Sequence, residues 1–185
     1  MKNKLPVALG ALVLAAVGVS VLAHDGGRKA FRVFAKLEPT NEVPSLSSVA
    51  SGSFRATIDT ANQTITYEVR YSGLEGDVLQ SHIHLGQHSV NGGISVFLCG
   101  NPPQVPPATF PQPPACPPSP ATVTGVITPA NIIGPAAQGI APSVDGVEEF
   151  DELVDAIRSG VTYANVHSTK FPGGEIRGQV SDNAR

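Results

Sequence analysis

Two histidines separated by a single residue, His82 and His84, stand near the middle of the chain. Their spacing matters because side chains in a β-strand alternate between its two faces, so both imidazoles would project from the same face. Their Cα atoms would then lie about 7 Å apart, a separation from which both rings can reach one ion. Imidazole nitrogen is a favoured ligand of copper and zinc, and this pair therefore indicates metal binding.

A third histidine, His167, ends a second strand-like segment near the C-terminal end of the chain. We expect Ala164 and Val166 to face the core of the domain, because they are the apolar members of an alternating pattern. Alternation would then place Asn165 and His167 together on the opposite face. The sequence thus offers a third imidazole for the same ion.

The candidate metal ligands are therefore His82, His84 and His167, with copper or zinc as the ion. His88 could supply a fourth position, but it lies in a turn and is expected to be exposed to solvent. The alternative is structural, because a buried imidazole can satisfy backbone groups near a turn. No catalytic residue is predicted, since the chain has neither a G-x-S-x-G motif nor a Cys/His nucleophile pair.

The elements that must position these residues are mostly strands. Period-two alternation is clearest from Gln63 to Tyr71, where every second residue is Ile, Tyr or Val. One helix is expected where Phe150, Leu153 and Ile157 fall on a single helical face. The expected strands span residues 31–37, 53–59, 63–71, 81–85, 93–99, 121–128, 161–167 and 175–180.

This pattern predicts an all-β fold, a Greek-key β-sandwich or barrel of about eight strands with one short helix. The fold would be superoxide-dismutase-like or immunoglobulin-like. The acidic balance of 12 Lys and Arg against 15 Asp and Glu argues against a nucleic-acid partner. The charges are also dispersed, so no polybasic membrane patch is present in the sequence.

The N-terminal residues predict export. Two lysines precede an apolar run over 5–22, and Val21 and Ala23 fit the small-residue positions of a signal-peptidase site. We expect 1–23 to be a cleaved signal peptide and 24–30 a flexible start of the mature protein. The alternative is a membrane anchor, but the run is at the lower length limit for a span and rich in Gly and Ala. The expected location is secreted or periplasmic, with no membrane span after cleavage.

Cysteine usage agrees with an oxidising compartment. Cys99 and Cys116 are the two cysteines of the chain, and they bracket a segment dominated by proline. A disulfide between them would stabilise the fold by about 3 kcal/mol through loop closure. The alternative, a metal-binding or redox pair, lacks the C-x-x-C spacing that would favour it.

Three motifs along the chain resemble those of the chordin-type (CHRD) domain family. They are FAKL with NEVP at 34–44, SHIHLG with NGG at 81–93, and SGVTYANVHS with PGGEIRGQ at 159–179. The resemblance implies an exported domain over 31–181, in which the proline-rich segment at about 99–120 is an insertion. It also implies a non-enzymatic binding module, because chordin binds growth factors; the partner here would be an unidentified protein or a metal ion.

A second, weaker resemblance concerns the histidines alone. A His-x-His strand with a later histidine on a neighbouring strand is similar to the copper side of copper/zinc superoxide dismutases. This resemblance implies an alternative function, a copper-binding periplasmic or extracellular redox protein that uses His82, His84 and His167. Dismutase activity is not expected, because the chain has five histidines and no loop rich in His and Asp.

Overall fold

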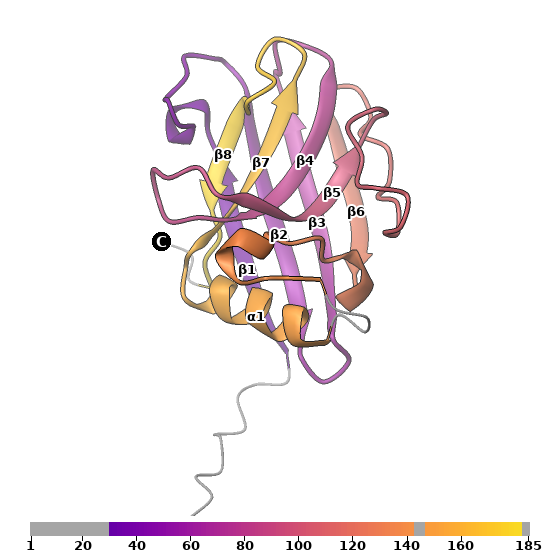
Figure 1. Cartoon of the computed structure of the whole chain (residues 1–185). Coiled ribbons are helices and arrows are strands. Elements are labelled where there is room, and N and C mark those ends of the chain that lie inside the picture. The colour runs from indigo at the N-terminus through magenta and orange to yellow at the C-terminus, as the bar shows by residue number, and fades with distance from the viewer. Residues whose placement is uncertain (1–29, 143–146, 183–185) are drawn as a thin grey trace, which may run out of the picture.

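The computed structural model describes residues 30–142 and 147–182 (Figure 1). The signal peptide expected over 1–23 lies outside the described residues, as does all but the last residue of the flexible start expected over 24–30. The strands are β1 Ala30–Leu37, β2 Ser51–Asp59, β3 Thr64–Ser72, β4 Val78–Leu85, β5 Gly93–Gly100, β6 Ala121–Ile127, β7 Thr162–Ser168 and β8 Ile176–Gln179; the helix is α1 Val147–Arg158.

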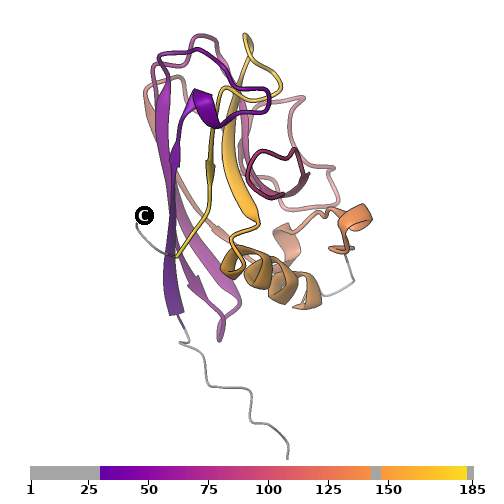
Figure 2. The same ribbon diagram turned by 90° about the vertical axis from the view of Figure 1, so that its left-hand side faces the viewer.

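The strands form two antiparallel sheets, with the orders β1-β2-β3-β6 and β5-β4-β7-β8. Figure 2 shows the two layers from the side. β6 returns to lie beside β3, and β7 returns to lie beside β4, which is the Greek-key pattern of long return connections. Backbone bridges from Phe34 to Ser181 and from Glu38 to Arg177 join the β1 side of one sheet to the β8 side of the other. The predicted all-β sandwich of eight strands with one short helix is confirmed.

The core lies between the sheets and is filled by the alternating apolar residues of the strands. Phe54 and Ile58 of β2 and Ile65 and Val69 of β3 are completely buried. Each such side chain contributes about 1.5–3 kcal/mol through the hydrophobic effect. These are the positions that period-two alternation selects in the sequence.

The helix α1 covers one end of the sandwich (Figure 1). It packs there through the apolar stripe that the spacing of its apolar residues predicts. Phe150, Leu153 and Ile157 are each at most 1% exposed. The helix ends before Gly160, whose positive φ of 69° favours glycine over other residues.

A disulfide joins Cys99 at the end of β5 to Cys116 in the proline-rich segment, as predicted. Asn101 fastens the same segment by donating hydrogen bonds to the carbonyls of Val78 and Cys116. The segment is therefore anchored to the end of β5 by the disulfide and by hydrogen bonds, which include those from Cys116 N to Asn101 Oδ1 and from Gly100 N to the carbonyl of Pro114.

The sheet β5-β4-β7-β8 is covered on both faces, whereas the sequence pattern predicts cover on the core face alone. Every residue of β7 is buried. The second face is covered because residues 86–92 and 129–140 fold over it. The backbone N–H of Ile133 donates a hydrogen bond to the carbonyl of Ser95, and the side-chain amide of Gln138 donates one to the carbonyl of Leu85.

Within the described residues, no helix combines the length and hydropathy that crossing a bilayer requires.

Candidate metal centre

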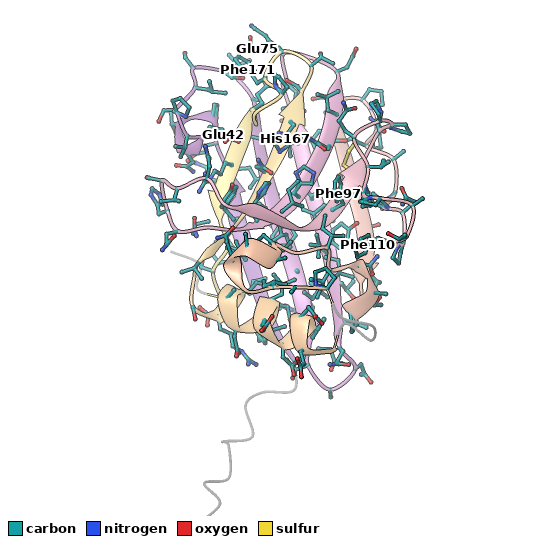
Figure 3. All side chains as sticks on the ribbon, in the orientation of Figure 1. Glu42, Glu75, Phe97, Phe110, His167 and Phe171 are labelled. Atoms are coloured by element: carbon teal, nitrogen blue, oxygen red, sulfur yellow. A yellow bond between two sulfur atoms is a disulfide. The ribbon has the colours of Figure 1, made fainter. Side chains whose placement is uncertain are left out.

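The three predicted histidines come from the two central strands of the covered sheet. β4 carries His82 and His84, and β7 carries His167. The antiparallel register sets His82 opposite Asn165 and His84 opposite Tyr163. His167 is two residues beyond Asn165, so it shares the same face of β7. In Figure 3, His167 lies on the β7 part of this sheet.

The pairing of β4 with β5 is irregular on both sides of His82. Register shifts occur between Ser81 and His82 and between Ile83 and His84. Such bulges change the direction in which a strand side chain points and are frequent next to functional sites. Here they orient the two imidazoles of the His-x-His strand.

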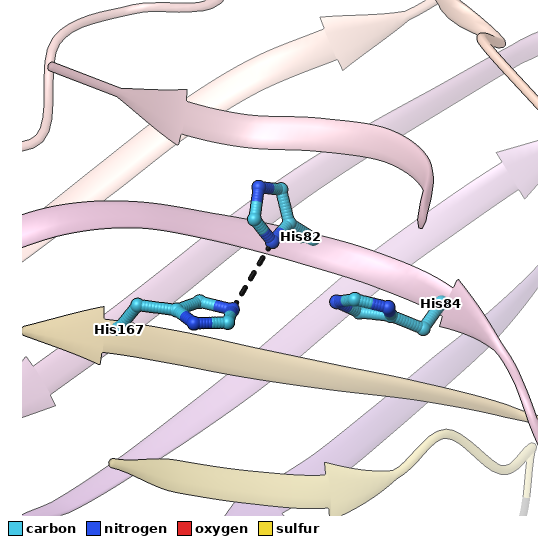
Figure 4. A group of neighbouring side chains, drawn as sticks. All are labelled: His82, His84 and His167. Carbon is cyan, nitrogen blue, oxygen red and sulfur yellow. Dashed lines mark hydrogen bonds between the residues drawn. The ribbon is translucent and has the colours of Figure 1, made fainter. Parts of the chain in front are cut away.

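The three imidazoles point toward one another (Figure 4). The ring centroids of His82 and His167 are 4.9 Å apart, and those of His82 and His84 are 5.2 Å apart. One nitrogen from each ring lies within 4.8 Å of the other two. Nitrogen ligands about 2.0–2.1 Å from one ion are separated by at most about 4 Å. Small side-chain movements, of under about 1 Å, would therefore bring the set onto a single ion.

Backbone carbonyls fix the tautomers of two of these rings. His84 Nδ1 lies 3.0 Å from the carbonyl oxygen of Gly92, and His167 Nδ1 lies 2.9 Å from that of Pro172. A carbonyl oxygen only accepts hydrogen bonds, so each Nδ1 carries the hydrogen and each Nε2 presents a lone pair. This second hydrogen bond is the usual support of a metal-bound histidine.

His82 completes the arrangement through its other nitrogen. His82 Nδ1 lies 3.2 Å from His167 Nε2, the contact drawn as a dashed line in Figure 4. Because His167 Nε2 is an acceptor, His82 Nδ1 is the donor in the protein without an ion. To bind a metal through Nδ1, His82 would have to move its hydrogen to Nε2. His82 Nε2 and His84 Nε2 are buried without a hydrogen-bond partner.

Burial keeps all three imidazoles neutral. It lowers the pKa of His82 well below its usual 6.5, and the neighbouring His167 and His84 lower it further. Burial lowers the pKa of His84 to about 4, although the hydrogen bond to Gly92 partly offsets this effect. Burial also lowers the pKa of His167. Neutral imidazole is the form that binds metals, so the lone pairs are available at neutral pH.

A stack of side chains supports His84 from one side. The ring of Tyr163 lies parallel to that of His84, with an interplanar angle of 3° and a centroid distance of 4.6 Å. The guanidinium of Arg177 lies on Tyr163 and donates hydrogen bonds to the carbonyls of Gln87 and Val90. These two carbonyls belong to the loop that also supplies Gly92. The stack thus fixes the position of the His84 ring. It also fixes the loop whose Gly92 carbonyl sets the tautomer of that ring.

Sequence reasoning missed this supporting role of Tyr163 and Arg177. Both residues lie within the last of the three motifs, but their roles depend on the β7–β8 pairing. That pairing sets Arg177 opposite Asn165, on the face that carries the histidines.

Glu42, from the first motif, is a buried carboxyl beside this cluster. It is 6% exposed, and its Oε1 has no hydrogen-bond partner. Burial raises the pKa of Glu42 to about 7, against the opposing charge of Arg177. Glu42 and Pro172, whose carbonyl holds His167, line one small cavity of about 210 Å³.

The remaining histidine of the described residues lies apart. His88 is exposed and contacts Ser89 Oγ at 2.8 Å, in agreement with its expected place in a turn.

Comparison with known proteins gives one family assignment. The model of the CHRD domain matches residues 33–180. This match includes the His-x-His strand, His167 and the proline-rich segment. No curated protein and no solved structure matches the chain.

Proposed function

Because the chain belongs to the CHRD domain family, we propose that it is an exported, non-enzymatic binding module that holds one copper or zinc ion. The ligands are His82, His84 and His167. The ion ties β4 to β7 at the centre of the sheet, next to the loops that would meet a protein partner.

The observation that supports this proposal is an excess of hydrogen-bond acceptors in the buried histidine cluster. The tautomers of His84 and His167 leave two Nε2 lone pairs directed into the cluster, and His82 Nδ1–H is the one donor shown to reach them. His84 Nε2 is left without a partner. An unpaired buried polar atom costs about 1–3 kcal/mol, and a cation bound by these nitrogens would remove that cost.

Protons satisfy these lone pairs poorly, because burial lowers the pKa of His84 and also that of His167. A divalent metal ion suits them better, since it forms short bonds to several neutral imidazoles at once. Copper and zinc are the ions that this donor set favours.

Export is supported by two features. The Cys99–Cys116 disulfide is of the kind that persists outside reducing compartments. The CHRD assignment fits an extracellular setting. On this proposal, 1–23 is the signal peptide, 31–181 is the mature domain, and about 99–120 is an insertion that the disulfide fastens to the sheet.

A copper-dependent redox function is the second candidate. The observation that favours it is the preformed set of three neutral imidazoles, which is suited to copper. Limited access counts against it, since His82 is fully buried while His84 and His167 are 7% and 6% exposed. Reversible reduction of a Cu(II)-loaded sample at a defined potential would favour the redox function. The absence of such a step would favour the binding module.

The test of metal binding compares the protein with two sets of variants. Purified protein is loaded with Cu(II) or Zn(II), dialysed, and its bound metal measured by elemental analysis. We expect about one equivalent in the wild type and in the control His88→Ala. A triple His82→Ala, His84→Ala, His167→Ala variant should retain almost none. Circular dichroism checks that the variants are folded, and unchanged stoichiometry in a folded triple variant would exclude the site.

A further inference from the structure

Asn165 lies on the same face of the sheet as the three histidines. It pairs with His82 across the β4–β7 ladder and precedes His167 by two residues on the same face. It is 2% exposed. The β4–β7 register also makes Asn165 a diagonal neighbour of His84, within the reach of side chains on one sheet face.

The side-chain oxygen of Asn165 lacks a hydrogen-bond partner. Asn165 Oδ1 is buried without a hydrogen-bond partner, as is His84 Nε2. Both atoms are acceptors, because the hydrogen of His84 is on Nδ1. Two neighbouring acceptors cannot satisfy one another, whereas a cation between them satisfies both.

We propose that the carboxamide oxygen of Asn165 is the fourth ligand of the metal ion held by His82, His84 and His167. This inference rests on the proposed function. Four protein ligands make a closed, four-coordinate site of the kind that zinc occupies in structural sites. The ion then has no open position for a substrate, and it acts as a cross-link between β4 and β7.

The chemistry of the four donor atoms limits which metal ions suit the site. A carboxamide oxygen is a hard, neutral donor, so it suits Zn(II) and Cu(II) better than the softer Cu(I). All four ligands are neutral. The bound ion therefore keeps its full positive charge, in contrast to sites with a thiolate or carboxylate ligand.

The closed site can be tested with azide as a probe, because a small anion binds a metal ion only where a position is open or holds water. Cu(II)-loaded wild-type protein is titrated with azide and followed by its charge-transfer absorption. We expect the wild type and the control Asn62→Ala, which changes an asparagine in the distant β2–β3 turn, to bind azide much more weakly than Asn165→Ala, because Cu(II) with four protein ligands can take azide only at a weak axial position. In Asn165→Ala, water would replace the carboxamide and an azide band should appear.

Zinc affinity, measured by competition with a chromophoric chelator, gives a second readout. Asn165→Ala should bind Zn(II) about 10–100-fold more weakly than the wild type at unchanged one-to-one stoichiometry. Asn165→Asp keeps an oxygen ligand and adds a negative charge, so it should bind Zn(II) at least as tightly as the wild type and exclude azide. Asn165→Asp also tests the role of the side-chain oxygen if Asn165→Ala does not fold.

The outcomes separate the two proposals. Uptake of no ion by the wild type would overturn the metal site itself and the ligand role with it. Azide binding by the wild type that is as tight as by Asn165→Ala would overturn the role of Asn165 alone. Equal or tighter zinc binding by Asn165→Ala would do the same, because the carboxamide would then be neutral toward the ion or in competition with it.

Discussion

The guanidinium carbon of Arg177 lies 3.3 Å from the ring centroid of Tyr163. Arg177 is 2% exposed, so this cation–π contact is shielded from water. The other face of Tyr163 is available to stack on His84. One buried arginine thus connects the loop at 87–91 to His84 through a single aromatic ring.

Arg177→Lys should destabilise the protein by about 2 kcal/mol, because lysine keeps the charge but loses the planar, multiple donation of the guanidinium. Urea unfolding measures the change. Arg55→Lys, on the exposed outer face of β2, is the matched control and should alter stability by less than about 0.5 kcal/mol. Equal effects of the two substitutions would show that the stack contributes nothing specific.

Removal of metal should leave a protein whose stability falls as pH falls. Unfolded histidine titrates near 6.5, whereas folded His84 titrates near 4, so the unfolded chain binds more protons between these values. The free energy of unfolding is then at its full value above pH 6.5 and declines as the pH is lowered to 4. For His84 alone the loss is on the order of 3 kcal/mol.

Chemical denaturation in the presence of EDTA, repeated from pH 4 to 8, measures this dependence. His84→Phe, which keeps an aromatic ring against Tyr163, should reduce the slope between pH 4 and 6.5. The exposed His88 is the control, and His88→Gln should leave the slope unchanged. An unchanged slope in His84→Phe would contradict the prediction.

Glu42 should lower the stability of the protein as the pH rises, which is opposite to the effect of His84. Its pKa is raised from 4.5 to about 7, so the folded protein binds the extra proton between these values. The stability from this group is fully present below pH 4.5 and is lost as the pH rises through 7, with a magnitude on the order of 3 kcal/mol. Glu42→Gln keeps the shape without the charge and should remove this loss.

The comparison of unfolding at pH 5 and pH 8 separates Glu42 from the histidines, whose contribution has the opposite sign. Relative to the wild type, Glu42→Gln should gain stability at pH 8. Glu152→Gln, on the exposed side of α1, is the control. A gain of the same size in the control would indicate a general charge effect.

Loss of the disulfide should weaken the fold without emptying the metal site. A Cys99→Ser, Cys116→Ser double variant should lose about 3 kcal/mol, since the closed loop has a sequence separation of 17 residues. Thermal unfolding measures the loss, and elemental analysis should still find about one equivalent of metal. Loss of metal from a folded double variant would mean that the proline-rich segment helps to form the site.

The sandwich could be predicted from the sequence because strands such as β2 and β3 have one apolar and one polar row. The alternation of Ile65, Tyr67, Val69 and Tyr71 was sufficient to define β3 to within one residue at each end. The spacing of Phe150, Leu153 and Ile157 predicted the buried face of α1, since a helix on a core needs one apolar stripe.

The surroundings of the histidines could not be predicted, because they depend on long-range pairing and on irregular segments. The position of Arg177 over Tyr163 follows from the β7–β8 register, which sequence periodicity does not specify. The cover over the imidazoles comes from residues 86–92 and 129–140, whose composition indicates only turns. Alternation places Asn165 on the face of His167, but an asparagine on a strand belongs to no metal-binding motif, so the sequence did not mark it as a ligand.

The hydrogen bond from His167 Nδ1 to the carbonyl of Pro172 couples the metal centre to the loop between β7 and β8. Any partner that displaces this loop must also change how strongly the ion is held, and thermodynamic reciprocity requires the ion to change the affinity for that partner by the same factor. On the proposed function, metal occupancy and the position of this loop are therefore linked, so the bound ion alters the surface that the loop presents.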